Sequence, residues 1–178
     1  MKSERIGKGE MVVLYPVWLK VTQAKCLVVG GGQIALRRAT TLLSCGAHVV
    51  VVSPELCPEL AAMHECGDIA YIPARYDPSH VTDSKLVIAA TDSRDVNAAI
   101  GRDARKQGIL CNMADSQAES DFFLPSVVAC GSVQVAISTG GSSPATAKAL
   151  RLALAADMED GGNRFVSMLR SLPDSLSR

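Results

Sequence analysis

Residues 25–38 read Lys-Cys-Leu-Val-Val-Gly-Gly-Gly-Gln-Ile-Ala-Leu-Arg-Arg, and the rest of the chain is organised around this stretch. The apolar, β-prone run at residues 26–29 predicts a short strand, and the three glycines after it predict a turn. Apolar residues then recur at helical spacing until Gly46, where the pattern stops. The predicted order is therefore strand, glycine turn and helix.

Gly30, Gly32 and Ala35 fit the G-x-G-x-x-G/A fingerprint of a dinucleotide-binding fold. In that fold Gly30 permits the tight turn, Gly32 lets a pyrophosphate approach the backbone, and Ala35 lets the helix pack closely on the strand. The helix N-terminus offers free N–H groups to the phosphates. The alternative is a glycine-rich turn in any α/β protein, but the strand and helix on either side favour dinucleotide binding.

Further β-prone runs alternate with helical segments along the chain. Such alternation predicts a doubly wound, parallel α/β sheet of the Rossmann type. An additional run at residues 12–19 predicts an edge strand, because Pro16 excludes a central position. The other expected strands are residues 47–53, 69–73, 86–90 and 109–113, and the helices are residues 55–66 and the segment from Asp92 or Ser93 to Gly108.

After Met113 the alternation stops, which places a soft boundary there. Apolar runs at residues 122–129 and 132–138 flank Cys130-Gly131, and this spacing predicts a β-hairpin. A second glycine loop at residues 138–144 precedes a helix that Ser143 can cap and that runs to about Met158. Residues 163–172 predict a last short helix.

Composition restricts the class of protein. The 178 residues carry 18 basic and 18 acidic side chains, so the formal net charge is zero, and no long basic run favours nucleic acid or an anionic membrane as a partner. No apolar stretch reaches the length of a membrane span, and residues 1–10 lack the apolar region of a signal peptide. We expect a cytoplasmic protein.

Cysteines and histidines show no metal-site spacing. The six cysteines form no C-x-x-C pair and the three histidines are scattered, so we expect six free thiols and no structural metal.

The end of the second expected strand bears on cofactor choice. The fingerprint predicts an acidic residue there that binds the ribose 2′-hydroxyl, but the chain has Ser53-Pro54-Glu55, so the acid is displaced to Glu55. No arginine stands nearby in the sequence to favour a 2′-phosphate. This predicts NAD rather than NADP, although Glu55 could equally stabilise the first turn of its own helix.

Polar residues follow two further strands at the same edge of the expected sheet. Asp115 lies just past the fifth strand, where a carboxylate can accept the proton lost as a hydride leaves; the alternative is a loop-starting Asx turn, and the residues alone leave both open. Thr91, Asp92 and Asn97 follow the fourth strand and are expected at the cofactor, although Asp92 can also simply cap its helix.

Six blocks of sequence together resemble one family. They are Tyr-Pro-Val-Trp-Leu (15–19), Val-Val-Gly-Gly-Gly-Gln-Ile-Ala (28–35), Ala-Ala-Thr-Asp (89–92) with Val96-Asn97, Cys-Asn-Met-Ala-Asp (111–115), Phe-Leu-Pro-Ser (123–126) and Ser-Thr-Gly-Gly-Ser-Ser-Pro (138–144). Over about residues 11–160 the chain resembles precorrin-2 dehydrogenase, which is also the N-terminal part of siroheme synthase. The glycine fingerprint is common to many enzymes, but its pairing with the blocks at 112–115 and 138–144 is more specific.

The resemblance implies an oxidoreductase that converts precorrin-2 to sirohydrochlorin with NAD, in siroheme or cobalamin biosynthesis, and that acts as a homodimer. It implies an acid/base role for Asp115. Residues 138–144 end at a helix N-terminus, which suits the carboxylates of such a substrate. The expected cofactor contacts are Gly30, Gly31, Gly32, Gln33, Ile34, Ser53, Pro54, Glu55, Thr91, Asp92 and Asn97, and the expected substrate contacts are Asn112, Ser138, Thr139, Gly140, Gly141 and Lys148.

These inferences divide the chain into an NAD-binding domain at residues 1–113 and a region for dimerisation and the substrate cleft at residues 114–178. Because the sequence ends at Arg178, we expect no methyltransferase domain of the kind that the fused enzymes carry. Two alternatives stay open: a bifunctional enzyme that also inserts iron, and a non-catalytic module that senses NAD.

Overall fold

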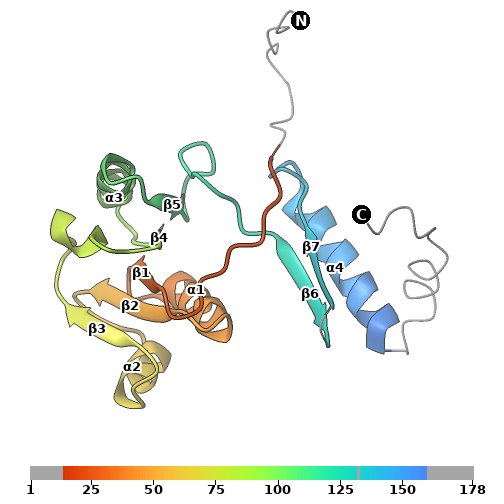
Figure 1. The fold of residues 1–178 in the computed structure, drawn as a ribbon, viewed down its shortest axis with the longest axis horizontal. Helices are drawn as coiled ribbons and strands as arrows, with labels where there is room; N and C mark the ends of the chain where they lie inside the picture. The colour runs from red at the N-terminus through yellow and green to blue at the C-terminus, as the bar shows by residue number, and fades with distance from the viewer. Residues whose placement is uncertain (1–13, 132, 160–178) are drawn as a thin grey trace, which may run out of the picture. The chain divides into compact units, whose positions relative to one another are not determined.

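The computed structural model describes residues 14–131 and 133–159. It contains two compact units, one formed by residues 17–123 and the other by residues 124–159 with residues 14–16 (Figure 1). Each unit has its own secondary structure, and the larger one contains the glycine turn.

The larger unit is a five-stranded, fully parallel sheet with the strand order β3-β2-β1-β4-β5. This confirms the predicted Rossmann-type fold. Its strands are β1 (Lys25–Val29), β2 (His48–Ser53), β3 (Ala70–Pro73), β4 (Leu86–Ala89) and β5 (Leu110–Met113). Its helices are α1 (Gln33–Ser44), α2 (Pro58–Glu65) and α3 (Arg94–Lys106), with a short 3₁₀ helix at Pro78–Val81 that the sequence did not predict.

Alternate residues of β1 face opposite sides of the sheet. Cys26 and Val28 pack with buried residues of α1 and α2, whereas Leu27 and Val29 pack with Ile100 of α3 and its neighbours. Helices therefore cover both faces of the sheet (Figure 1). This explains why β1 and β2 read as nearly continuous apolar runs rather than as alternating patterns.

The strand order reverses at β1. The chain proceeds from β1 outward through β2 and β3, then returns to the other side of β1 with β4 and β5. In open α/β sheets a ligand crevice forms at such a switch point, outside the carboxyl ends of the strands. The residues that follow β1, β2 and β4 are therefore the ones positioned to contact a ligand.

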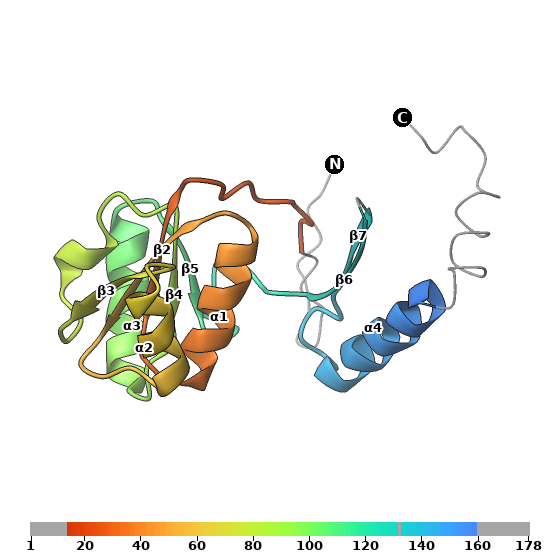
Figure 2. The ribbon, with the colours of Figure 1, turned by 90° about the horizontal axis from the view of Figure 1, so that it is seen from below.

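The smaller unit contains the predicted hairpin, with β6 (Ser126–Cys130) paired antiparallel to β7 (Val133–Ile137). Helix α4 (Pro144–Glu159) packs along β6, where Val128 and Ala147 are buried (Figure 2). The Ser143 hydroxyl accepts a hydrogen bond from the backbone N–H of Thr146 at 3.2 Å, which is the expected N-terminal cap.

One predicted element is wrong over the residues that can be compared. Residues 14–19 form no strand, because Pro16 lacks a donor and Tyr15, Val17 and Trp18 are exposed instead of packed on a sheet. The predicted helix at residues 163–172 lies outside the described residues.

Candidate dinucleotide-binding site

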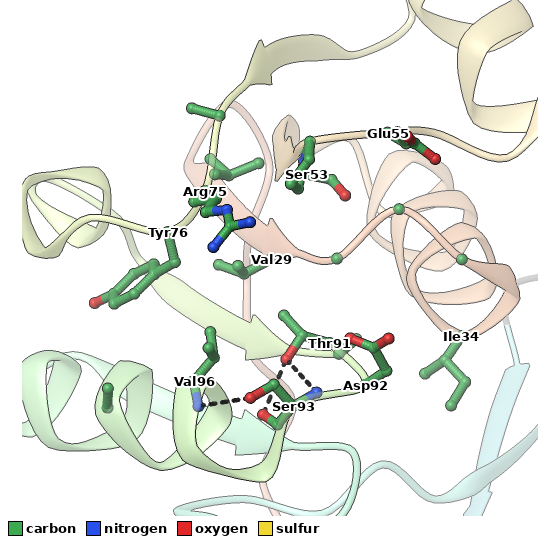
Figure 3. Close-up of a pocket in the computed structure, with 18 of the residues that line it drawn as sticks. Val29, Ile34, Ser53, Glu55, Arg75, Tyr76, Thr91, Asp92, Ser93 and Val96 are labelled. Atoms are coloured by element: carbon green, nitrogen blue, oxygen red, sulfur yellow. Dashed lines mark hydrogen bonds between the residues drawn. The ribbon is translucent and has the colours of Figure 1, made fainter.

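A pocket of about 1110 Å³ opens at the carboxyl ends of the parallel strands of the larger unit (Figure 3). Its lining comes from the glycine turn after β1, the loop after β2, the segment after β3, and the loop after β4 with the start of α3. Every residue that the sequence predicted to bind the cofactor, except Asn97, lines this pocket.

Gly30 and Gly31 allow three backbone segments to meet at one point. Gly30 has φ +126°, and a Cβ added to it would lie 2.3 Å from the carbonyl oxygen of Ala90. A Cβ on Gly31 would lie 1.8 Å from the carbonyl oxygen of Glu55. Gly31 occupies a variable position of the fingerprint, so sequence reasoning gave it no structural role, yet the loop after β2 packs directly on it.

Gly32 differs from its two neighbours. Its backbone is extended, with φ −93° and ψ −169°, and a Cβ there would meet no protein atom within 4 Å. Gly32 is also the N-cap of α1, which has no side-chain cap and no acidic residue in its first turn. The first N–H groups of α1 are therefore left for a ligand at the pocket, as an anion such as a pyrophosphate requires. The open space at Gly32 leaves room for that group, so this end of the pocket fits a dinucleotide.

The loop after β2 is held by the neighbouring strand. The Tyr71 hydroxyl of β3 lies 3.0 Å from the carbonyl oxygen of Ser53 and 3.2 Å from that of Pro54. The Cys57 N–H donates to the carbonyl oxygen of Gly31 at 2.7 Å. Ser53 and Glu55 thereby keep a fixed position beside the glycine turn.

The loop after β4 is held by Asn97, which is fully buried. Its Oδ1 accepts from the N–H of Thr91 at 3.1 Å and from the Thr91 hydroxyl at 2.7 Å, and its Nδ2 donates to the Thr91 carbonyl at 3.1 Å. Both polar ends of Asn97 are thus bonded to Thr91, and Asn97 does not line the pocket. Thr91 and Asp92 line it, whereas Asn97 fixes the backbone of Thr91.

Arg75 and Tyr76 line the pocket from the segment after β3, and sequence reasoning missed both. They are remote from Ser53 in the chain, but Pro73 of β3 is the register partner of Ser53. Only the pairing of β3 with β2 brings Arg75 and Tyr76 to the end of β2. Sequence patterns do not predict the order of strands in a sheet, so these two residues could not be found from the sequence.

Tyr76 forms a fixed wall of the pocket. Its hydroxyl donates to Asp103 Oδ2 at 3.2 Å, and Lys106 Nζ lies 2.9 Å from Asp103 Oδ1. Burial, followed by the negative charge of Asp103, raises the pKa of Tyr76 well above its ordinary value. The hydrogen bond from Lys106 lowers the pKa of Asp103, so the pair is a neutral phenol donating to a carboxylate.

The expected acid/base residue and the expected substrate residues lie outside this pocket lining. Asp115 follows β5 with its side chain 31 % exposed, and Arg94 Nη1 lies 3.9 Å from its Oδ2. Asn112 is buried, and its Nδ2 donates to the Phe122 carbonyl at 2.8 Å, so it joins β5 to the following loop.

Residues 138–144 and Lys148 belong to the smaller unit. The glycine loop is closed by its own hydrogen bonds: Thr139 Oγ1 lies 3.1 Å from the Ser143 carbonyl and 3.2 Å from the Ser143 N–H. Gly140 and Gly141 have φ of +61° and +83°, which favours glycine at both positions. Lys148 is exposed on α4.

Cys26, Cys45, Cys57, Cys66 and Cys111 are free thiols. Over residues 14–131 and 133–159, no three or more His, Cys, Asp or Glu side chains are grouped as a metal ion would require. In that same part of the chain, no helix has the length and apolar character needed to cross a membrane.

Residues 17–126 match the family model described as "Putative NAD(P)-binding". The chain belongs to this family. It is 38 % identical over 162 residues to siroheme synthase of Chromobacterium violaceum, an alignment that covers 91 % of this chain and 34 % of that protein. It is 43 % identical over 136 residues to siroheme synthase 1 of Aeromonas salmonicida, covering 76 % of this chain and 29 % of that protein.

The chain therefore spans about a third of the length of these relatives. Among solved structures, SirC, a precorrin-2 dehydrogenase, superposes with a TM-score of 0.72 and 29 % identity, over 81 % of this chain and 71 % of that one. These matches confirm the resemblance inferred from the sequence blocks, and a nicotinamide dinucleotide is the class of cofactor that the family binds.

Proposed function

We propose that the protein is an NAD-dependent oxidoreductase that converts precorrin-2 to sirohydrochlorin in siroheme or cobalamin biosynthesis. The observation that carries the proposal is the glycine turn at the strand-order switch, where Gly32 faces open space beside the uncapped start of α1. The likeness to siroheme synthases and to SirC supplies the substrate.

The residues of the pocket act by binding and orienting. The N–H groups at the start of α1 would hold the pyrophosphate of the cofactor, and Thr91 and Asp92 would contact it from the loop after β4. Bound NAD supplies the hydride acceptor. The oxidation removes two hydrogens from the substrate: one leaves as a hydride to NAD, and the other leaves as a proton, which Asp115 accepts.

We also propose a homodimer in which the hairpin contributes to the interface. Helix α4 covers part of the hairpin, where Val128 is buried. Exposed apolar side chains still occur on β6, β7 and α4, at Val127, Val133, Leu150 and Leu152. A second copy would cover them.

The test is to mix the purified protein with NAD and precorrin-2 and to follow NADH absorbance. We expect NADH to form only when all three components are present. Binding of NAD by calorimetry without NADH formation would contradict the dehydrogenase and favour the sensing module. Adding ferrous iron after oxidation and following the product spectrum separates an enzyme that also inserts iron from one that does not.

A further inference from the structure

Arg75 is the one cationic side chain among the described residues that line the pocket. It is exposed, and no hydrogen bond or ion pair joins its guanidinium to another described residue. Figure 3 shows the guanidinium directed into the pocket, between Ser53 and Tyr76. A free guanidinium inside a pocket is available for an anionic group of a ligand.

Arg75 lies at the part of the fold where dinucleotide-binding proteins bind the ribose next to the adenine. In dinucleotide-binding folds that ribose lies at the carboxyl end of the second strand, where an acidic side chain bonds its 2′-hydroxyl or a nearby arginine accommodates a 2′-phosphate. Here β2 ends at Ser53, and the register pairs Ser53 with Pro73. Arg75 follows Pro73 by two residues and so lies beside the end of β2.

The charges around this point favour a phosphate over a hydroxyl alone. Ser53, the last residue of β2, is neutral and so does not repel a phosphate. The nearest acid in the sequence, Glu55, is drawn with its carboxylate directed away from Arg75 (Figure 3). Among the other carboxylates that line the pocket, Asp103 is already paired with Lys106 at 2.9 Å, and Asp92 and Asp95 follow β4 rather than β2.

The backbone beside Arg75 is fixed. Tyr76 is held by its hydrogen bond to Asp103, and the Ala74 N–H donates to the Ile72 carbonyl at 2.9 Å. A planar guanidinium on a fixed backbone can donate two parallel N–H bonds to phosphate oxygens.

We propose that Arg75, beside the neutral Ser53, forms a 2′-phosphate subsite at the adenosine end of the pocket, so that the protein binds NADP as well as NAD. This inference rests on the proposed function, because it assumes that the pocket binds a nicotinamide dinucleotide. It adds a specificity-determining residue that the sequence around Ser53 does not reveal.

The experiment is calorimetry with four probes: NADP, NAD, adenosine 2′,5′-bisphosphate and 5′-AMP. The proteins are the wild type, Arg75→Ala, Arg75→Glu and the control Arg102→Ala, which removes an exposed arginine of α3 outside the pocket lining. We expect the wild type to bind NADP at least as tightly as NAD. Arg75→Ala should weaken NADP and the bisphosphate by about 10- to 100-fold, the range for charge-assisted hydrogen bonds, and NAD and 5′-AMP by less than about threefold.

Arg75→Glu should weaken NADP further, since it places a like charge beside the phosphate, and Arg102→Ala should change neither cofactor. Equal weakening of NADP and NAD in Arg75→Ala would overturn the proposal and indicate that Arg75 stacks on the adenine. Binding of NAD with NADP excluded from the wild type would overturn it too, while leaving the proposed function in place. If neither cofactor binds the wild type, the inference and the cofactor part of the proposed function both fail.

Discussion

Arg94 Nη1 lies 3.9 Å from Asp115 Oδ2, and Arg94 Nη2 lies 2.5 Å from Glu119 Oε2. Arg94 is the first residue of α3, and both carboxylates belong to the loop after β5. All three side chains are substantially exposed, and such pairs contribute little to stability. The contact with Arg94 places Asp115 beside the start of α3, where the adjacent Ser93 lines the pocket.

Asp115→Asn tests the proposed proton acceptor. Asparagine keeps the size of the side chain but removes its basicity, so the dehydrogenase rate should fall by about two to four orders of magnitude. The affinity for NAD should stay the same, because Asp115 is not among the pocket-lining residues. Glu119→Gln is the matched control, since it removes the other carboxylate bonded to Arg94 and should change the rate little. A near-normal rate in Asp115→Asn would show that this residue is only a turn residue.

Gly32→Val tests the pyrophosphate position. The valine side chain finds no protein atom near its Cβ, so the variant should fold, but the side chain should occupy the space of the pyrophosphate and abolish NAD binding. The contrast is Gly31→Ala, whose Cβ would lie 1.8 Å from the Glu55 carbonyl oxygen and which should unfold at a lower temperature. Calorimetry and thermal unfolding measure the two effects. Tight NAD binding by a folded Gly32→Val protein is incompatible with the proposed site.

Asn97→Ala tests the role of the buried amide. The substitution removes the two hydrogen bonds between Asn97 and the Thr91 backbone and the one from the Thr91 hydroxyl, so the free energy of unfolding should fall by about 1–3 kcal/mol. Urea denaturation measures this change. Thr91→Ser keeps a hydroxyl for Asn97 and should cost much less. Equal stability of wild type and Asn97→Ala would mean that the bonds to Thr91 are dispensable.

The buried thiols give a pH-dependent prediction. Burial, as the main cause, raises the pKa of Cys26 and of Cys111 from 9.0 to about 11. Iodoacetamide should therefore modify the exposed Cys45 and Cys66 in the native protein, and Cys26 and Cys111 only in urea. Peptide mass spectrometry after timed labelling identifies each site.

The same two thiols should make the folded protein less stable at high pH. Their pKa is higher in the folded protein than the ordinary 9.0, so their contribution to stability is fully present below pH 9.0 and is lost as the pH rises toward about 11. The urea concentration at the midpoint of unfolding should fall as the pH rises across this window. Cys26→Ser is unsuitable as a control, because it buries a hydroxyl group in place of the thiol. A midpoint that stays constant across the window would contradict the assignment.

Val127→Glu tests the proposed dimer. Val127 of β6 is 44 % exposed, and a charge there should weaken association of two hairpins. Light scattering at micromolar protein should give a dimer for the wild type and a lower mass for the variant. Val17→Glu, a like substitution at a valine that is 66 % exposed outside the hairpin, is the control. A monomeric wild type would exclude the interface.

The sequence by itself determined the local elements of this protein. Apolar periodicity and glycine positions gave the parallel strands, their helices, the glycine turn and the hairpin, because each depends on residues close together in the chain. The same local chemistry identified Gly30–Ile34, Ser53–Glu55, Thr91 and Asp92, all of which line the pocket. The prediction was wrong at residues 14–19. The apolar composition there indicated a strand, but these residues pair with no neighbouring strand.

Only the tertiary structure decided what those elements bring together. Lateral strand order depends on hydrogen bonds between segments distant in sequence, and that order places Arg75 beside the end of β2. The tertiary structure also decided that the loop at Glu55 packs against Gly31 and that the fully buried Asn97 forms hydrogen bonds with Thr91. The physical reason is the same in each case: a close contact or a buried hydrogen bond depends on which backbone segments pack against each other, and no residue pattern within a single segment specifies its partner.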